Sequence, residues 1–217
     1  MFGEAFEKAI KEREKDFSAY DDVSVMVASW NVAGFVPTSG FDMSSLFNTE
    51  GNPAPDVIVV GLQEYIVTSA TSMVMSAGKE GIQLWQDTIL NNLKFLDKYD
   101  FVREKHLQGM LLLIFAKEKM RDRITKVEAD VVKTGGGGYV GNKGATLIKL
   151  FIDDSSFCFI NCHIEPGPGS TANNTRLLNL IDIHQRAFQA GNIGRSTVSF
   201  FLKNLRNNHV KIGIENE

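Results

Sequence analysis

Hydrophobic and polar positions along the chain follow both strand and helix periods. The longest β-branched run, Val57 to Val60, has no polar break, which is typical of a strand buried on both faces. Pro55 precedes this run and Gly61 follows it, so we expect the strand to span residues 55–61. Glu64 comes just after the strand, where a carboxylate needs a partner or water. The partner of Glu64 is therefore the first functional question.

Further strands are predicted where apolar residues alternate or form short continuous runs. Val23, Val25 and Val27 alternate on one face of a first strand, which ends at Asn31. Residues 145–151 and 157–163 are predicted to form a hairpin. The other predicted strands are residues 101–105, 110–117, 124–133 and 210–214, and residues 198–205 fit either a helix or a strand.

Three segments show the spacing of amphipathic helices. The first lies within residues 1–20 and carries an apolar stripe from Phe2 to Ile10; we expect it to cap the body of the fold. The others follow residues 82–96 and 176–188, and the small, polar residues 68–81 are predicted to form a mobile loop beside Glu64. Hairpin-connected strands covered by two or three helices indicate an α+β layered sandwich.

Composition narrows the class of protein. A net charge of −3 gives no general attraction to nucleic acid. The N-terminus lacks the apolar segment of a signal peptide, and the apolar run 110–116 is too short to cross a bilayer. Cys158 and Cys162 lie too far apart along one strand for an easy disulfide. We expect a cytoplasmic protein with reduced thiols and peripheral membrane contact.

Polar side chains occur at the ends of four predicted strands, and they are Asn31, Glu64, Asn142, Lys143, Asn161 and His163. Glu64 beside amide oxygens offers the hard ligands that Mg²⁺ prefers. Lys143, among glycine amides, suits a phosphate anion, and His163 suits a hydrogen bond to a phosphoryl oxygen. If these strand ends share one edge, the set predicts Mg²⁺-assisted phosphoryl transfer to water.

Each of these residues has a structural alternative. Glu64 fits a helix cap or an ion pair as well as a metal site, and Asn31 precedes a Gly/Pro turn. A glycine-rich loop alone is weak evidence of phosphate binding. Lys143 also fits a solvated charge, and His163 a structural histidine. Only their combination favours a functional site.

Five motifs follow the order found in a known enzyme family. They are Ser29-Trp30-Asn31-Val32, Pro55-Asp56-Val57-Ile58 with Gly61-Leu62-Gln63-Glu64, Gly109-Met110-Leu111-Leu112, Gly141-Asn142-Lys143-Gly144-Ala145 and Phe159-Ile160-Asn161-Cys162-His163. Over residues 23–188 the chain resembles the inositol polyphosphate 5-phosphatases of the Mg²⁺-dependent endonuclease/exonuclease/phosphatase superfamily. The Gly-Asn-Lys-Gly motif, followed by a strand ending in Asn-x-His, is the most specific part of this resemblance.

The resemblance implies a four-layered α/β sandwich, with residues 21–217 forming the N-terminal portion of a catalytic domain. It implies that Glu64 ligates Mg²⁺ and that Asn31, close to the metal, is a second metal ligand and a catalytic residue. It also implies that His163 is catalytic and contacts the scissile phosphate. It places Asn142, Lys143 and Asn161 at the substrate. The implied reaction removes the 5-phosphate of phosphoinositides or inositol polyphosphates, with no nucleic acid partner.

The resemblance weakens toward the C-terminus. Gly213-Ile214-Glu215-Asn216 stands where the family has Gly-Asp-x-Asn, which keeps Asn216 as a catalytic candidate but replaces the aspartate by Ile214. The later Ser-Asp-His motif has no counterpart. We therefore expect a sandwich with an incomplete second half, exposed apolar sheet surface and little phosphatase activity. The alternatives are a catalytically dead phosphoinositide-binding module and, less favoured, a nuclease of the same superfamily.

Overall fold

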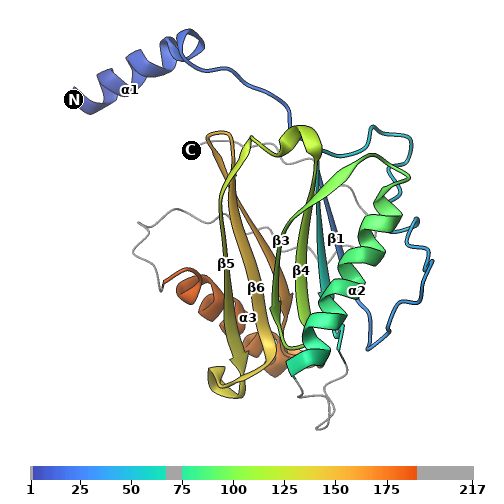
Figure 1. Ribbon diagram of the computed structural model, residues 1–217. Helices are drawn as coiled ribbons and strands as arrows, with labels where there is room; N and C mark the ends of the chain where they lie inside the picture. The colour runs from blue at the N-terminus through green and yellow to red at the C-terminus, as the bar shows by residue number, and fades with distance from the viewer. Residues whose placement is uncertain (1, 67–74, 190–217) are drawn as a thin grey trace.

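The strands form two sheets that face each other (Figure 1). The computed structural model describes residues 2–66 and 75–189. The first sheet has the order β1 (Val25–Asn31), β2 (Val57–Gln63), β4 (Met110–Lys117) and β3 (Tyr99–Leu107). In it β1 and β2 are parallel, and the other pairs are antiparallel. The second sheet is antiparallel, in the order β5 (Ile124–Gly135), β6 (Val140–Ile152) and β7 (Ser155–His163).

The central strand β2 is buried on both faces, as its sequence predicts. Val57 and Val59 pack between the two sheets, whereas Ile58 and Val60 pack on the opposite face, in the cluster that contains Trp85 of α2. Each of the four is at most 1% exposed. An uninterrupted β-branched run therefore supplies both faces of an interior strand.

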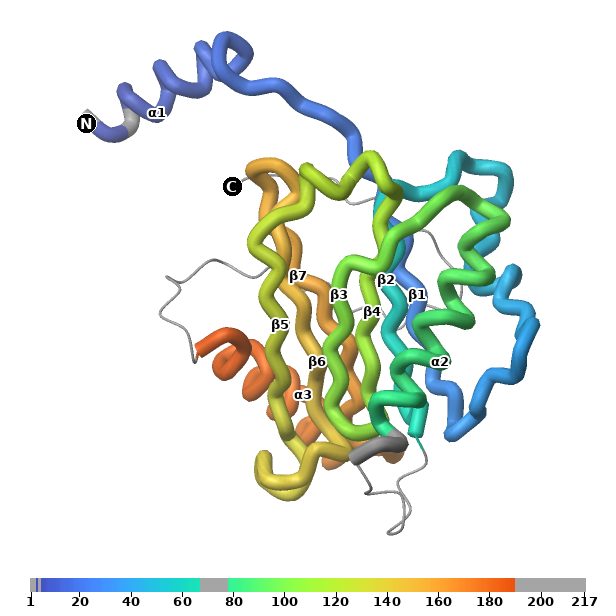
Figure 2. The backbone as a smooth tube through the Cα atoms, in the orientation of Figure 1, coloured from blue at the N-terminus to red at the C-terminus, as the bar shows by residue number. Residues whose placement is uncertain are grey.

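Helices cover the two outer faces and complete four layers (Figure 2). The helix α2 (Met75–Leu93) packs on the first sheet through buried Trp85 and Ile89. The helix α3 (Gly169–Arg186) packs on the second sheet through buried Ile183. The order is α2, first sheet, second sheet and α3, so the predicted four-layered α+β sandwich is confirmed.

The second sheet leaves part of the first uncovered. Its described strands end at β7, which packs over β2 and β4. Val25 contacts the core between the sheets, but Val27, two residues along the same face of β1, is 47% exposed. Within residues 2–66 and 75–189, Val27 is therefore an exposed apolar position on the face of β1 that points toward the second sheet.

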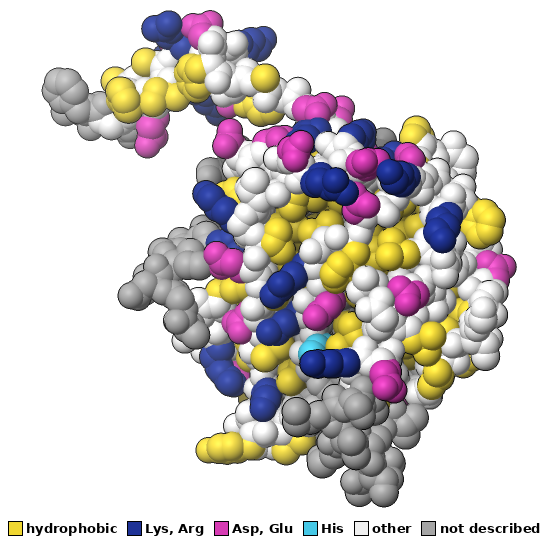
Figure 3. All heavy atoms as spheres, in the orientation of Figure 1, with side chains coloured by type: hydrophobic (Ala, Val, Ile, Leu, Met, Phe, Trp, Pro, Cys, Tyr) yellow, Lys and Arg dark blue, Asp and Glu magenta, His cyan; other side chains and the backbone are white. Residues whose placement is uncertain are grey.

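The N-terminal helix α1 (Phe2–Glu12) does not cap the body of the fold. Phe6 is 68% exposed and Ile10 is 43% exposed. The helix extends away from the sheets and carries hydrophobic side chains on its surface (Figure 3). The predicted helix is present, but the prediction that it packs on the body is wrong, because an amphipathic pattern does not specify what covers its apolar face. The short 3₁₀ turn η1 (Glu14–Asp16) follows it.

Several element boundaries differ from those expected. Residues 75–81 belong to α2 rather than to a loop, and α3 begins at Gly169 rather than near residue 176. The strand β6 begins at Val140, so Asn142 and Lys143 lie inside a strand rather than before it. The glycine run forms the tight turn η3 (Gly136–Gly138) of the β5–β6 hairpin, in which all three glycines have positive φ.

Some expectations fall outside the described residues. These are residues 198–205, expected as a helix or a strand, the expected strand 210–214, Asn216 and residues 68–74 of the expected loop. Within the described chain, no helix is long and apolar enough to cross a membrane. Cys158 and Cys162 are free thiols, and burial raises the pKa of Cys158 to about 11 and that of Cys162 to about 12.

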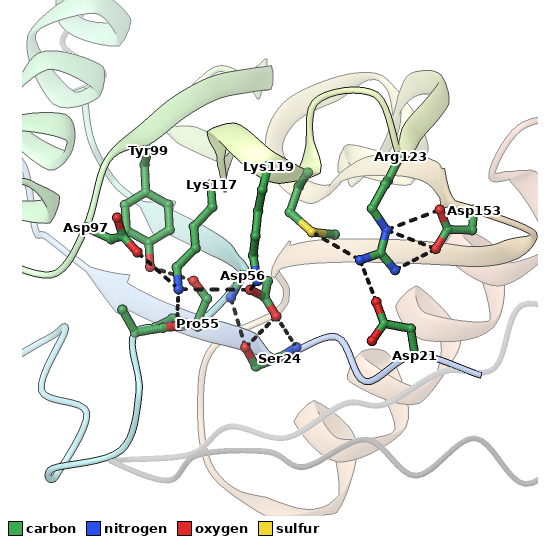
Figure 4. A network of polar contacts seen from close by, with 12 residues as sticks. Asp21, Ser24, Pro55, Asp56, Asp97, Tyr99, Lys117, Lys119, Arg123 and Asp153 are labelled. Carbon is green, nitrogen blue, oxygen red and sulfur yellow. Dashed lines mark hydrogen bonds and ion pairs between the residues drawn. The ribbon is translucent and has the colours of Figure 1, made fainter. Parts of the chain in front are cut away.

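A buried carboxylate joins the strands at the end opposite Glu64 (Figure 4). Asp56, which is 8% exposed, accepts hydrogen bonds from the backbone N–H and the hydroxyl of Ser24. Lys119, in the 3₁₀ turn η2 (Glu118–Met120), places its Nζ 2.7 Å from Oδ1 of Asp56. These contacts tie the start of β1 to the start of β2 and to the turn after β4.

A second ion-pair group links the two sheets at that end. Arg123 contacts Asp153, in the β6–β7 turn, at 2.6 Å and Asp21, before β1, at 2.8 Å (Figure 4). Both carboxylates are more than half exposed, so these pairs contribute little to stability individually. They fix the segment through which the chain enters the first sheet.

Candidate functional site

Two neighbouring strands bring Asn31 and Glu64 together. The parallel register pairs Asn31 with Gln63, which places Asn31 beside the next residue of the second strand. Nδ2 of Asn31 donates a hydrogen bond to Oε1 of Glu64 at 3.0 Å. The N–H of Ala33 donates to Oδ1 of Asn31 at 3.0 Å. Because that N–H fixes the orientation of the amide, Asn31 presents its nitrogen to the carboxylate.

The backbone holds Glu64 in a left-handed conformation, with φ of 55°, which is uncommon for a residue other than glycine. Hydrogen bonds on both sides maintain it. The N–H of Gly34 donates to the carbonyl of Glu64 at 2.7 Å, and the N–H of Tyr65 donates to the carbonyl of Gly109 at 3.1 Å. The Glu64 side chain is 47% exposed, so the turn keeps the carboxylate out of the core.

The β6–β7 hairpin supplies a lysine and a histidine to the same place. Its register pairs Gly144 with His163, which puts Lys143 beside the imidazole. Nζ of Lys143 lies 2.6 Å from Nε2 of His163. The same Nε2 lies 3.6 Å from Oε1 of Glu64. The two sheets therefore meet at this end through His163 and Glu64.

The electrostatics of this contact favour a neutral imidazole. Burial lowers the pKa of His163, the charge of Lys143 lowers it further, and Glu64 opposes the shift. An ammonium group can only donate a hydrogen bond. In the contact with Lys143, Nε2 of His163 is therefore the acceptor, and its proton is on Nδ1.

The structure thus brings together Asn31, Glu64, Lys143 and His163, as the strand-end argument predicts. Their catalytic and ligand-binding roles stay predictions. Asn142 lies on the exposed side of β6, close against Gly135 in the same hairpin. An added Cβ at Gly135 would fall 2.4 Å from Oδ1 of Asn142. Asn142 therefore stays accessible near Lys143.

Asn161 lies elsewhere, inside the sandwich. Its side chain is in the core between the sheets, and the residue is 4% exposed. Nδ2 donates to the carbonyls of Leu62 and Leu111, and Oδ1 accepts a hydrogen bond from Gln63. The expected role of Asn161 as a substrate-binding residue does not fit this placement, because its polar atoms are turned into the protein.

Gln63 and Gly61 lie next to Asn161, and no role was predicted for either of them. Nε2 of Gln63 donates to Asn161 and, at 3.2 Å, to the hydroxyl of Ser29. A Cβ at Gly61 would lie 3.0 Å from Cγ of Asn161. The available signals were an amide ending a buried apolar run and a glycine within a strand, which often marks a close approach.

The donor set is compatible with a divalent ion that takes few ligands from the protein. No group of three or more His, Cys, Asp or Glu side chains suited to a metal occurs in residues 2–66 and 75–189. Mg²⁺ commonly uses one or two carboxylates and completes its shell with water and phosphate oxygens. Glu64, oriented by Asn31, meets that requirement.

The chain is similar to known phosphatases in sequence. The family model for endonuclease/exonuclease/phosphatase family 2 matches residues 28–210. An inositol-1,4,5-trisphosphate 5-phosphatase of Schizosaccharomyces pombe is 37% identical over 162 residues, which are 73% of this chain and 15% of that protein. A polyphosphatidylinositol phosphatase of Saccharomyces cerevisiae is 33% identical over 153 residues, 70% of this chain and 14% of that protein.

A solved structure is also similar. The inositol polyphosphate 5-phosphatase domain of SPsynaptojanin, in complex with inositol (1,4)-bisphosphate and a calcium ion, matches with a TM-score of 0.68 and 30% identity. The match covers 83% of this chain and 51% of that domain. The chain therefore spans about half of the solved domain and a smaller share of the curated relatives. On the family match and the shared fold, this chain belongs to the endonuclease/exonuclease/phosphatase family 2.

Proposed function

We propose that this chain carries the metal- and phosphate-binding part of an Mg²⁺-dependent inositol 5-phosphatase site. The substrate would be the 5-phosphate of a phosphoinositide or a soluble inositol polyphosphate. The convergence of Glu64, Lys143 and His163 from the two sheets carries the proposal. The names of the similar 5-phosphatases and the inositol bisphosphate in the similar solved domain support it.

The chemistry follows from the charges at this end. Glu64, held by Asn31, would ligate the ion. When bound, Mg²⁺ supplies positive charge that neutralises phosphoryl oxygens. Lys143 would donate to a phosphate oxygen in a charge-assisted hydrogen bond. His163, near both groups, would donate from Nε2–H to the transferring phosphoryl group once Lys143 turns toward the anion and the ring carries a proton on Nε2.

We also propose that the 217-residue chain turns over slowly by itself. Hydrolysis needs a group that orients and deprotonates the attacking water. By the resemblance, the Gly-Asp-x-Asn and Ser-Asp-His motifs of the family supply these groups, and in this sequence Ile214 stands in place of the first aspartate. Binding of the metal and the phosphate is therefore expected to exceed catalysis in this chain.

Contact with a membrane surface is proposed for a lipid substrate. Apolar residues are exposed in the loop after Asn31 and in the turn before Lys143: Val36 is 61% exposed and Tyr139 is 89% exposed. Side chains of this kind favour shallow contact with a lipid interface. Co-sedimentation with vesicles containing phosphatidylinositol 4,5-bisphosphate should fall on Tyr139→Ser. Equal binding to neutral vesicles would contradict this contact.

Phosphate release tests the proposed function. The chain is incubated with inositol 1,4,5-trisphosphate in Mg²⁺ or in EDTA, beside Glu64→Gln and the matched control Glu118→Gln. Glu118 is at the opposite end, paired with Lys98. We expect slow release that requires Mg²⁺, is lost in Glu64→Gln and is retained in Glu118→Gln. Release that is independent of Mg²⁺, or equal in both variants, would contradict the proposal.

A further inference from the structure

A layer of polar side chains interrupts the apolar core between the two sheets. Asn161 is 4% exposed, Gln63 is 8% exposed and Thr146 is fully buried. The rest of this inter-sheet core is apolar and includes Val57, Val59, Leu112, Ile114, Ile148 and Leu150. A buried amide is costly unless its hydrogen bonds are formed. The layer is therefore tolerated only in an arrangement that satisfies Asn161 and Gln63.

Asn161 joins the second sheet to both central strands of the first. Its Nδ2 donates to the carbonyl of Leu62 in β2 at 2.9 Å and to that of Leu111 in β4 at 3.2 Å. Leu62 and Leu111 face each other in the sheet register. One amide on β7 thus bridges a paired position of the opposite sheet, and Gln63 satisfies its remaining oxygen.

This contact requires close approach at one position. Gly61 lies beneath the Asn161 side chain, and a Cβ there would meet Cγ and Oδ1 of Asn161, both at 3.0 Å. Residues along a strand are spaced by about 3.3 Å, so a slip of one residue between the sheets would remove the amide from both carbonyls. The layer therefore allows a single register of β7 on β2.

The same register sets the geometry of the site. Gln63 immediately precedes Glu64, and Asn161 lies two residues before His163 on β7. We propose that Asn161 and Gln63 are positioning residues that hold the Glu64 carboxylate and the His163 imidazole at their 3.6 Å separation. A role of Asn161 and Gln63 in phosphate chemistry rests on the proposed function. Their effect on the distance between Glu64 and His163 does not.

Thr146 provides a matched control inside the same layer. It lies opposite Asn161 in the β6–β7 register and is fully buried, but its hydroxyl has no hydrogen-bond partner. Thr146→Val should therefore leave the site unchanged. Ile152→Ala, at the other end of the inter-sheet core, controls for a general loss of stability.

The experiment compares Asn161→Ala, Gln63→Met and Gly61→Ala with these two controls in the full chain. The first readout is the imidazole NMR signal of His163 without metal, assigned by its loss in His163→Gln. The second is Mn²⁺ affinity by electron paramagnetic resonance, and urea unfolding ranks stability. We expect the three layer variants to move the His163 signal and to weaken Mn²⁺ binding by about tenfold, as for other residues that orient metal ligands.

The controls should leave both site readouts at their wild-type values, although Ile152→Ala lowers the urea midpoint. A folded Asn161→Ala with a wild-type His163 signal would overturn the proposal, and so would controls that move the signal as much as the layer variants. If Asn161→Ala does not fold, Gly61→Ala is tested in its place by the His163 signal and the Mn²⁺ affinity, because this variant keeps every polar group. Wild-type values in a folded Gly61→Ala would then overturn the proposal. If the wild-type chain binds no Mn²⁺, the proposed metal site fails, while the NMR comparison still tests the positioning.

Discussion

Nζ of Lys143 lies 2.6 Å from Nε2 of His163. The contact places a cation against a partly buried imidazole, at the end of the sandwich that also carries Glu64. Once an anion arrives, Lys143 can donate to it, and His163 can donate as well when its ring carries a proton on Nε2. This relationship makes the His163 titration a direct probe of the site.

Lys143→Met should raise the pKa of His163. Burial lowers this pKa first and the lysine charge second, so removal of the charge relieves part of the shift. NMR titration in EDTA measures the change, with His163→Gln identifying the signal. Lys98→Met, at the far end beside Glu118, is the control and should leave the titration unchanged. An unchanged or lower His163 pKa in Lys143→Met would contradict the assigned contact.

The same shift predicts how stability depends on pH. The folded state holds the His163 pKa below its ordinary value of 6.5. As pH falls below 6.5, the unfolded chain therefore takes up a proton that the native chain does not, and the free energy of unfolding decreases. Urea unfolding across this range should show a smaller decrease in His163→Gln. Equal pH dependence of the two proteins would count against a depressed pKa.

Asn31→Ala should weaken metal binding without removing the metal ligand. The Asn31 amide donates to Glu64 and is itself fixed by the N–H of Ala33. Residues that orient a metal ligand typically contribute about tenfold to a hundredfold in affinity. Mn²⁺ titration followed by electron paramagnetic resonance measures the effect. Asn142→Ala, in the exposed part of β6, should bind Mn²⁺ like the wild type; the reverse order of the two variants would contradict the role given to Asn31.

Asp56→Ala should destabilise the fold by about 3 kcal/mol, because it leaves the N–H of Ser24 and nearby lysines without their buried partner. Burial alone would raise the pKa of Asp56, but Lys119 and Ser24 lower it overall. This contribution is present above the ordinary carboxyl pKa and is lost as pH falls through the lowered value. Lys119→Met, which changes a 63% exposed side chain, should cost less than about 1 kcal/mol. Equal losses in urea unfolding would contradict the burial argument.

Removal of residues 1–17 should leave the melting temperature of the sandwich nearly unchanged. The described side chains of α1 are exposed, and the helix contacts mainly the adjacent turn η1. Calorimetry of the shortened chain measures the effect. Internal deletion of residues 87–94, in and just after α2, serves as the opposite case because it removes buried Ile89 and Leu93. A drop in melting temperature as large as that of the α2 deletion would show that α1 stabilises the body.

The layers of the fold could be predicted from sequence because the apolar content of each strand indicates how deeply it is buried. The unbroken run at Val57–Val60 predicted a central strand, and the helical spacing around Trp85 predicted its cover. The position of α1 could not be predicted, because an apolar helical face does not specify which surface packs against it. The start of β6 was not predicted because a glycine-rich sequence shows no strand pattern. The pairing with β5 that defines this part of the strand depends on the hairpin.

Part of the site could also be predicted from the pattern of side chains along the strands. Charged and amide side chains at strand ends indicated that Asn31, Glu64, Lys143 and His163 would meet, which requires only that the strands share an edge. Asn161 was different, since its direction depends on how β7 lies over β2 and β4. No local pattern encodes the register between two sheets. The local signals of the close approach were the strand glycine Gly61 and the amide of Gln63 at the end of the buried run.

Calorimetric titration of the 217-residue chain with inositol 1,4,5-trisphosphate, in Mg²⁺ and in EDTA, tests whether Glu64 and Lys143 form the proposed metal and phosphate site. Wild-type protein should bind more tightly with Mg²⁺, and Glu64→Gln should lose that gain. Lys143→Met should weaken binding by about tenfold or more in either buffer, as expected for loss of a charge-assisted phosphate contact. Binding that does not depend on Mg²⁺ and is equal in the wild type, Glu64→Gln and Lys143→Met would contradict the proposed site.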